Sequence, residues 1–408
     1  MGAGAIGLMS AYHLVEHGVS VTIVDRVPPG QACSFGNAGW ITPSLANPVP
    51  EPGILGQVLT WLVQRDSPFS MRISEVLKDP GWFLGFLRAS RPGPYEKGLY
   101  AQGVFSLQGM EVLSQVQAKV PFELHRDGLL YVFHTDHEYE KHLKDFEKLA
   151  ALGMARPRKV EADLRDWEPG LHPDLKKALW VESDWHVRPD DMTGSLAAYL
   201  REKGVEFREG NVEGFVKTNG KVTALITSAG EIPGDAFLLA GGVWTGLLTK
   251  KLGVGLPLQG GKGYSITIWG AKLRLQRPLY FPDVRLACSP FAGGGLRLAG
   301  RMEIAGFDDR LDPRKVEALA RSADQALVGW REKEEGGREM AWTGLRPLLP
   351  DGLPAIGRLP RMENVFVAAG HGMLGITLSA PTGKAVADLM VKGETDLAVA
   401  PFDPGRFH

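Results

Sequence analysis

Hydrophobic residues recur with helical spacing directly after the first few residues of the chain. Four apolar side chains fall on one face of the predicted helix: Ile6, Met9, Leu14 and Val15. Gly18 follows, and a glycine at this place is typical of a helix C-terminus. The apolar run from Val19 to Val24 then predicts a buried parallel strand that ends at Asp25.

The pattern of apolar and polar positions also predicts the loops, helices and strands of the rest of the chain. Residues 26–56 are rich in Pro, Gly, Ala and Asn and predict a loop that faces a ligand. Residues 57–150 predict mostly helix, with a strand near 129–133. Further helices are predicted at 192–203, 313–331 and 380–391, and strands at 205–208, 236–240 and 364–369. Residues 256–310 alternate apolar and polar positions, which predicts an antiparallel sheet. Asn219-Gly220 between two strand-like runs predicts a hairpin.

Length and composition favour an enzyme of ordinary globular type. A chain of 408 residues is long for one core, so two lobes are expected. The net charge of -1 lacks the basic surplus that a nucleic-acid partner requires. Two cysteines, Cys33 and Cys288, make neither a disulfide framework nor a metal-binding spacing. With no transmembrane run and no signal-peptide pattern, a cytoplasmic location is expected.

The opening glycines have the spacing of a dinucleotide-binding fingerprint. Gly2, Gly4 and Gly7 form the G-x-G-x-x-G pattern, in which the glycines allow a tight turn, close approach to a pyrophosphate and helix packing. The helix N-terminus that follows suits phosphate. Asp25 lies where a carboxylate accepts hydrogen bonds from a ribose. A glycine-rich start before an ordinary helix is the alternative.

One part of this fingerprint is missing. The pattern normally follows a buried strand, and here only Met1 precedes it. Either the sheet lacks its usual central strand or the natural chain begins a few residues earlier, and we expect the second.

Four later blocks of sequence resemble the bacterial D-amino acid dehydrogenase branch of the D-amino acid oxidase superfamily. They occur in the family's order, as Ser34-Phe35-Gly36-Asn37-Ala38-Gly39 with Ile41-Thr42-Pro43, Lys262-Gly263-Tyr264-Ser265, Trp342-Thr343-Gly344-Leu345-Arg346-Pro347 with Pro350-Asp351-Gly352 and Ile356-Gly357, and Gly370-His371-Gly372-Met373-Leu374-Gly375-Ile376-Thr377. The similarity runs from the first residue to about residue 392.

The resemblance implies a fold of α/β plus α+β type. It has a discontinuous Rossmann-like FAD-binding domain, assigned to 1–50, 150–255 and 340–408. A substrate domain built on an antiparallel sheet is assigned to 51–149 and 256–339. The implied reaction converts a small D-amino acid to an imino acid, which water hydrolyses to a 2-oxo acid and ammonia.

The fingerprint and the resemblance together predict the residues that bind FAD. Ser34 and Asn37 are short polar residues that suit hydrogen bonds to the cofactor, although a local Asn-Gly turn explains them too. Val212 would offer its backbone to adenine, an assignment that rests on the resemblance. The predicted set is Gly2, Gly4, Ala5, Ile6, Gly7, Asp25, Arg26, Ser34, Asn37, Ala38, Gly39, Val212, Gly241, Gly242, Trp244, Gly344, Gly372, Met373, Leu374, Gly375, Ile376 and Thr377.

Arg346 is the main candidate for binding the substrate carboxylate. It lies in an apolar, proline-flanked segment, and a guanidinium grips a carboxylate with two hydrogen bonds. A structural salt bridge is the alternative. Tyr264 would bind the carboxylate or belong to the core, and His371 would border the flavin or be a buried structural histidine. Tyr280 is a further candidate for the pocket wall.

The chemistry needs alignment more than an acid or a base. A neutral amine would let hydride pass from Cα to flavin N5, and no general base is assigned. The helix after Thr377 has Pro381 in its first turn. It would point its positive end at the flavin pyrimidine and stabilise the reduced, anionic ring.

The electron acceptor and the surroundings of the enzyme leave several alternatives. The resemblance suggests a quinone or a dye-like acceptor rather than oxygen. The absence of an arginine between His371 and Leu374 weighs against the oxidase branch. The segment 55–86, with Leu59, Trp61, Leu62, Trp82, Phe83 and Phe86, would touch a quinone or a membrane surface, or pack between the lobes.

Three other functions compete with this hypothesis. One is a glycine, sarcosine or D-proline oxidising flavoenzyme of the same fold. The others are an NAD(P)-dependent dehydrogenase and a non-catalytic scaffold. An oligomer is compatible with the sequence.

Overall fold

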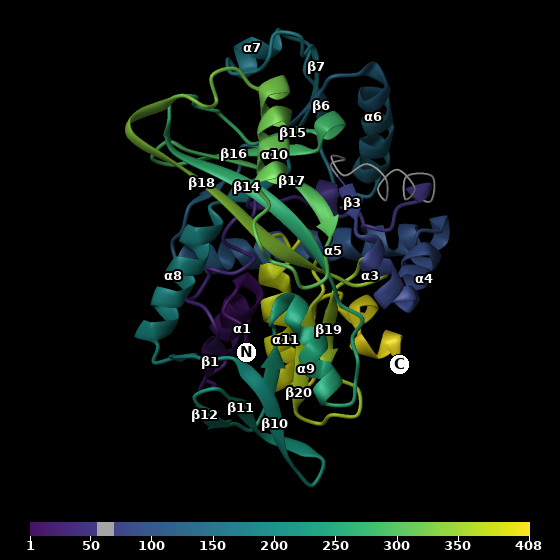
Figure 1. Cartoon of the computed structure of the whole chain (residues 1–408), viewed down its shortest axis with the longest axis vertical. Coiled ribbons are helices and arrows are strands. Elements are labelled where there is room, and N and C mark those ends of the chain that lie inside the picture. The colour runs from purple at the N-terminus through teal and green to yellow at the C-terminus, as the bar shows by residue number, and fades with distance from the viewer. Residues whose placement is uncertain (55–68) are drawn as a thin grey trace.

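The molecule, a computed structural model, is described for residues 1–54 and 69–408. Figure 1 shows two regions stacked along its long axis. The lower region holds both chain-end helices, α1 and α11, with several small sheets. The upper region is dominated by one large sheet. The expected mixture of helices and several sheets is therefore confirmed.

The lower region begins with the predicted glycine turn and helix. Helix α1 spans Ala5–Glu16 and leads into strand β1, Thr22–Asp25, which pairs in parallel with β9, Glu206–Glu209. The predicted strand is thus shorter than expected, because Val19 is 38% exposed and lies in the turn after Gly18.

A second small sheet lies on the other side of the first two residues. Its order is β13–β20–β19, with bounds Phe237–Leu239, Val365–Ala369 and Ala355–Arg358. The Met1 amino group donates to the Leu238 carbonyl at 2.9 Å, and Gly2 N–H donates to the Val24 carbonyl at 2.9 Å. Met1 and Gly2 therefore bridge the two sheets, at the place where the fingerprint leads us to expect a central strand.

The hairpin prediction is confirmed by strands β10 and β11. They span Val212–Thr218 and Lys221–Thr227, and β12, Gly230–Pro233, adds a third antiparallel strand. Asn219 and Gly220 both have positive φ, 50° and 80°. That backbone matches the twist of a two-residue turn, which is why Asn-Gly is favoured there.

The upper region is a nine-stranded sheet with the order β18-β14-β17-β16-β15-β5-β7-β6, and β3 pairs with β17. The strand bounds are β3 Phe69–Met71, β5 Leu129–Phe133, β6 Pro157–Lys159, β7 Lys177–Val181, β14 Gln259–Ala271, β15 Leu279–Phe281, β16 Leu286–Phe291, β17 Gly295–Ile304 and β18 Lys333–Leu348. The antiparallel pairing expected for 256–310 is confirmed in β14 to β17. Parallel pairs join β15 to β5 and β17 to β3.

Helix α10 covers the outer face of this sheet. It spans Pro313–Ala326, so the prediction that it runs to residue 331 is wrong at its C-terminal end. The chain leaves the helix because Leu327 bridges to Leu171 and Val328 N–H donates to the Gly170 carbonyl. Its inner face packs on Ile266 and Leu298 in a continuous apolar cluster.

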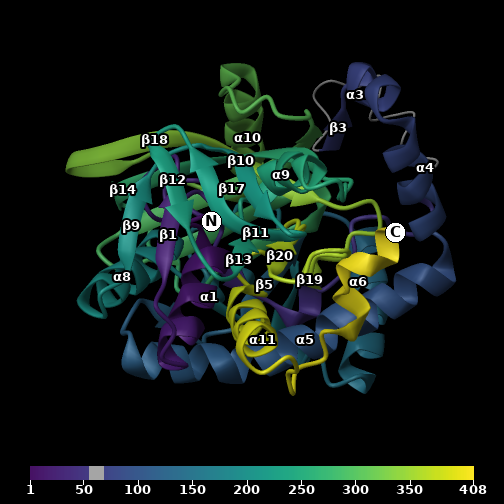
Figure 2. The same ribbon diagram turned by 90° about the horizontal axis from the view of Figure 1, so that it is seen from below.

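The remaining helices wrap the two regions and join them. They are α3 Ile73–Lys78, α4 Pro80–Ala89, α5 Pro92–Lys119, α6 Asp136–Ala151, α7 Leu164–Trp167, α8 Pro189–Glu202, α9 Thr245–Lys251 and α11 Ser379–Val391. A small sheet of order β2-β8-β4 uses Trp40–Ile41, Trp185–Val187 and Leu124–His125. Helix α5 packs against α11 (Figure 2), and a Cβ on Gly109 would come within 2.6 Å of Pro381.

Helical content matches the prediction for the described part of 57–150, and α11 and α8 occur where expected. Helix α8 begins three residues early, at Pro189, because proline suits the first helical turn. No helix within residues 1–54 or 69–408 has the length and apolar character to cross a membrane.

Candidate functional site

A cavity of about 780 Å³ runs between the two regions. Its walls come from the opening turn, the loop after β1, the closing loop before α11 and the inner face of the large sheet. Most residues predicted for cofactor and substrate line it. They are Gly2, Gly4, Ala5, Ile6, Asp25, Arg26, Ser34, Asn37, Ala38, Val212, Gly241, Gly242, Trp244, Tyr264, Tyr280, Gly344, Arg346, His371, Gly372, Met373, Leu374, Gly375, Ile376 and Thr377. Gly7 and Gly39 do not line it.

The glycine turn holds the N-terminus of α1 against the cavity. Gly2 has φ 96°, and a Cβ there would come within 2.3 Å of the Ala240 carbonyl oxygen. A Cβ on Gly7 would come within 1.9 Å of the Gly2 carbonyl oxygen, so Gly7 permits the close packing of helix on turn. Gly4 faces the cavity without such a clash.

The loop after β1 is tied to this turn by side-chain hydrogen bonds. Ala5 N–H donates to Ser34 Oγ at 3.0 Å, and Ala3 N–H donates to Asp25 Oδ2 at 2.6 Å. The Arg26 guanidinium stacks on the Trp244 ring at 3.8 Å from its centroid. Acidic, basic and aromatic side chains thus gather at one end of the cavity, beside Val212.

The closing loop is joined to the opening segment across more than 330 residues. The Thr377 hydroxyl donates to the Trp40 carbonyl at 2.9 Å and accepts from Thr42 N–H at 3.4 Å. Gly370 and Gly372 have positive φ, 84° and 54°, which lets the loop turn into the cavity. Two stretches far apart in sequence therefore line the same space, as expected.

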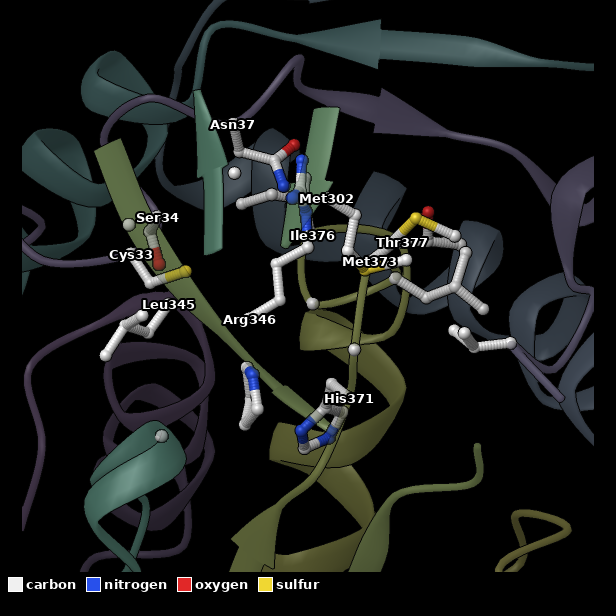
Figure 3. Close-up of a pocket in the computed structure, with 18 of the residues that line it drawn as sticks. Cys33, Ser34, Asn37, Met302, Leu345, Arg346, His371, Met373, Ile376 and Thr377 are labelled. Atoms are coloured by element: carbon white, nitrogen blue, oxygen red, sulfur yellow. The ribbon is translucent and has the colours of Figure 1, made fainter. Parts of the chain in front are cut away.

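Arg346 lies on β18 and reaches the cavity from the sheet side. Figure 3 shows it between Cys33 and Ser34 on one side and Met302, Met373 and Ile376 on the other. Burial lowers the pKa of its guanidinium. Arg346 Nη1 donates to the Arg301 carbonyl at 3.0 Å. No carboxylate of the described residues lies within ion-pairing distance of the Arg346 guanidinium. A buried cation with no acidic partner is costly unless a ligand supplies the charge.

The other three candidates for substrate binding differ in placement. Tyr264 is 1% exposed in the apolar cluster beneath α10, and its hydroxyl donates to Glu303 at 3.3 Å. His371 pairs with the Thr382 hydroxyl at 3.0 Å, and burial lowers its pKa to about 3, so the ring is neutral. Tyr280 lies edge-on to Trp40 and Tyr131, with ring centroids 5.6 Å apart in both pairs.

Arg297 is a supporting residue that sequence reasoning missed. It is 0% exposed on β17, and its Nη1 donates to the Phe35 and Asn37 carbonyls at 2.8 and 2.9 Å. Burial lowers its pKa to about 10, which leaves it charged at neutral pH. It fixes the Ser34–Gly39 loop from behind. An arginine at an inward position of an alternating strand was the available signal.

Trp342 and Cys33 also line the cavity, although neither is among the predicted site residues. The Trp342 ring packs so closely on Gly36 and Gly344 that a Cβ on either glycine would come within 2.2 Å of the ring. Burial raises the pKa of the Cys33 thiol to about 11, so it stays protonated beside Arg346.

A buried acid stands behind one wall of the cavity. Ser44 lines the cavity, and its hydroxyl donates to Asp184 and lies 3.1 Å from the Tyr131 hydroxyl. Asp184 is 0% exposed, and burial raises the pKa of its carboxyl to about 8. The acid is therefore mostly protonated at neutral pH. Nothing in the sequence pattern around Asp184 indicates this burial.

The cavity suits an organic dinucleotide rather than a metal centre. Nowhere in the described part of the chain do three His, Cys, Asp or Glu side chains gather so as to hold a metal ion. The helix N-terminus at Ala5, the close backbone at Gly4 and the acidic residue at the end of β1 are the donor and acceptor set that a dinucleotide requires.

Comparison with known proteins agrees with this geometry. The chain is 29% identical to a D-amino-acid oxidase of Bradyrhizobium diazoefficiens, over 100% of this chain and 98% of the relative. It is 31% identical to a D-amino acid dehydrogenase of Cereibacter sphaeroides, over 96% and 90%. A glycine oxidase from Bacillus cereus has the same fold, with a TM-score of 0.73 at 20% identity over 97% and 96%.

The family described as "DAO: FAD dependent oxidoreductase" matches residues 1–389, nearly the whole chain. FAD is therefore the cofactor of this enzyme, and the chain belongs to the DAO family of FAD dependent oxidoreductases.

Proposed function

We propose that this enzyme oxidises a small D-amino acid at Cα, giving an imino acid that water hydrolyses to a 2-oxo acid and ammonia. The observation that carries the proposal is Arg346, a buried guanidinium that faces the cavity without an acidic partner among the described residues. A substrate carboxylate supplies the missing negative charge. Both curated relatives act on D-amino acids by name, which supports the same substrate class.

The cofactor is held by the two loops that meet at Thr377. The N-terminus of α1, with Gly2, Gly4, Ala5 and Ile6, faces the pyrophosphate, and Asp25 faces the ribose. Arg26, Trp244, Val212, Gly241 and Gly242 line the adenosine end. Ser34, Asn37, Ala38 and Gly344 approach the flavin together with the closing loop, Gly372, Met373, Leu374, Gly375, Ile376 and Thr377. Bound FAD supplies the hydride acceptor.

The protein contributes orientation and electrostatics. Arg346 fixes the carboxylate with two charge-assisted hydrogen bonds, which sets the direction of the Cα hydrogen. Tyr280, with Trp40 behind it, forms an apolar wall for the substrate side chain. Gly7 and Gly39 act as packing positions, and Tyr264 supports the sheet through Glu303.

No general base is assigned in this proposal. His371 is neutral, but the Thr382 hydroxyl occupies its Nε2. The substrate instead reacts as the neutral amine, so we expect activity to rise with pH as more of the amine loses its proton.

We propose the domain division expected from the sequence in a modified form. A cofactor domain would keep 1–50 and the part of 340–408 that follows β18, because β18 ends at Leu348 in the large sheet. Strands β6 and β7, within 150–255, pair in the large sheet, so the boundary there would move to near residue 185.

Electrons are proposed to leave for a quinone or a dye-like acceptor. Part of the segment considered for this contact lies outside the described residues, namely Leu55, Leu59, Trp61 and Leu62. Trp82 and Phe86 are buried against Met302 and Ile304, which supports packing as their role. Peroxide formation in air, measured beside dye reduction, separates an oxidase from a dehydrogenase.

The nearest alternative is a glycine, sarcosine or D-proline oxidising enzyme. A glycine oxidase shares this fold, which is compatible with that alternative. The test is anaerobic bleaching of the bound flavin by D-alanine, L-alanine, D-proline, glycine and sarcosine. Fastest bleaching by D-alanine supports the proposal. Fastest bleaching by glycine or sarcosine, or by L-alanine, contradicts it. A protein that purifies without a flavin spectrum and cannot be loaded would overturn the FAD assignment.

A further inference from the structure

Strand β17 carries an irregularity directly beside Arg346. Lys262 pairs with Glu303, and Tyr264 pairs with Gly300, so two residues of β17, Arg301 and Met302, stand opposite Gly263 alone. Two residues against one define a β-bulge, which bends the strand and redirects its groups. Bulges occur often beside active sites.

The bulge marks a change of partner for β17. Residues 295–300 pair with β16, whereas residues 302–304 pair with β3. Arg301 is therefore the single residue between two ladders. A residue at such a junction can direct its backbone carbonyl toward a side chain.

Arg301 adopts a backbone conformation that is rare for its residue type. Its φ is 61°, in the left-handed region that non-glycine residues seldom occupy. Its Nη2 donates to the Ala318 carbonyl of α10 at 2.6 Å. The side chain is thus anchored on the outer face of the sheet, while the carbonyl points to the inner face.

That carbonyl is the acceptor for Arg346. Arg346 Nη1 lies 3.0 Å from it, and the guanidinium lies flat across Gly263, where a Cβ would be 2.0 Å from Nη1. A guanidinium has five N–H donors in a fixed plane. Fixing one donor at the bulge fixes the direction in which the other donors face the cavity.

We infer that the bulge at Arg301–Met302, opposite Gly263, is the device that orients Arg346 toward the substrate carboxylate. Arg301 is a positioning residue that acts through its backbone carbonyl, and Gly263 supplies the space. This inference rests on the role proposed for Arg346. It names the residues that hold the guanidinium in one orientation, so that Arg346 binds a carboxylate from one direction.

Two substitutions of Arg301 separate its backbone from its side chain. Arg301→Asn and Arg301→Val both remove the guanidinium and its bond to Ala318. Asparagine tolerates left-handed backbone, whereas β-branched valine strongly disfavours it. The comparison therefore isolates the conformation that aims the carbonyl.

The measurement is calorimetric titration of the FAD-loaded protein with propanoate, which has the carbon skeleton of alanine without its amine. We expect Arg301→Asn to bind within about threefold of the wild type and Arg301→Val to bind at least about tenfold more weakly. Propanamide, which lacks the charge, serves as the reference ligand, and its binding should change little. A merely structural defect would weaken both ligands and release FAD.

Gly263→Ala tests the same device from the opposite side. Its Cβ displaces the guanidinium, so propanoate binding should again fall by at least about tenfold. Equal binding by the two Arg301 variants, whether both strong or both weak, overturns the backbone role. If Arg346→Ala binds propanoate as well as the wild type does, the function proposed for Arg346 fails instead, and that result is distinct from the first.

Discussion

The ends of the cavity that we propose for the cofactor and for the substrate, called here the cofactor end and the substrate end, are built in different ways. At the cofactor end, one short segment makes the turn, the helix N-terminus and the strand that ends at Asp25. At the substrate end, Arg346 depends on Gly263, Arg301 and α10, which come from three distant segments. On the proposed function, one contiguous segment binds the dinucleotide, whereas residues brought together by the large sheet select the substrate.

Arg346→Ala should give the largest effect and should leave the cofactor end untouched. Losing a charge-assisted bidentate grip costs about 3–4 kcal/mol, so kcat/KM for D-alanine should fall by about 10²–10³-fold. Steady-state kinetics with a dye acceptor measures it, and the flavin spectrum should stay that of the wild type. A variant that loses FAD as well would mean that the two ends are not independent.

Gly7→Ala should give the reverse pattern. The new Cβ meets the Gly2 carbonyl oxygen at 1.9 Å, so the turn must open and FAD affinity should fall by at least about tenfold, or about 1.4 kcal/mol. Fluorescence of released FAD on dilution gives the affinity.

Gly194→Ala is the matched control. Gly194 lies in helix α8, and a Cβ there meets no atom within 4 Å. Alanine is the better helix former, so this variant should keep its FAD. Equal FAD affinity of the Gly7 and Gly194 variants would refute the packing role of Gly7.

Asp184 makes the wall of the cavity sensitive to pH. Its folded pKa of about 8 lies above the usual value of 3.8, so folding binds a proton that the unfolded chain releases. The contribution of Asp184 to the free energy of unfolding is largest below about pH 4, where the carboxyl is protonated in both states. It is lost as the pH rises toward 8, because the unfolded chain is then favoured by ionisation of the carboxyl. The free energy of unfolding should fall between pH 5 and pH 8, and Asp184→Asn should reduce that fall by about 3–4 kcal/mol. Denaturant melts at the two pH values test this, and an unchanged slope would exclude Asp184 as its source.

Thr377→Val should have the smallest effect. It removes the hydroxyl that joins the closing loop to Trp40 and Thr42, at a cost of about 0.5–1.5 kcal/mol. FAD should bind about threefold more weakly, with kcat/KM for the loaded enzyme nearly unchanged. Thr218→Val, at an exposed position of β10 that does not line the cavity, is the control. A change in kcat/KM larger than that in FAD affinity would place Thr377 on the substrate side instead.

The contrast between the two ends also explains what could be predicted from the sequence. Helix α1 and the Asn219-Gly220 turn follow from local patterns, whereas the meeting of the opening and closing loops follows from the resemblance to the family. Val19 was misplaced because its apolar side chain continues the strand pattern while the turn after Gly18 exposes it. Helix α10 ends early because Leu327 pairs with Leu171, a contact that local propensity does not encode.

The supporting residues of the substrate end had no comparable signal. Arg297 and Arg301 are two of several arginines in strands and turns, and only tertiary structure shows that one holds the Asn37 loop and the other offers a carbonyl to Arg346. The burial of Asp184 likewise depends on Ser44 and Tyr131 from distant segments.

The most direct test of the central claim is the rate of anaerobic flavin reduction by D-alanine in the wild type and in Arg346→Ala. The account predicts rapid bleaching of the wild-type flavin and bleaching at least about a hundredfold slower in the variant at the same D-alanine concentration, with the same amount of FAD bound. Equal rates in the two proteins, or a wild-type flavin that D-alanine does not bleach, would contradict it.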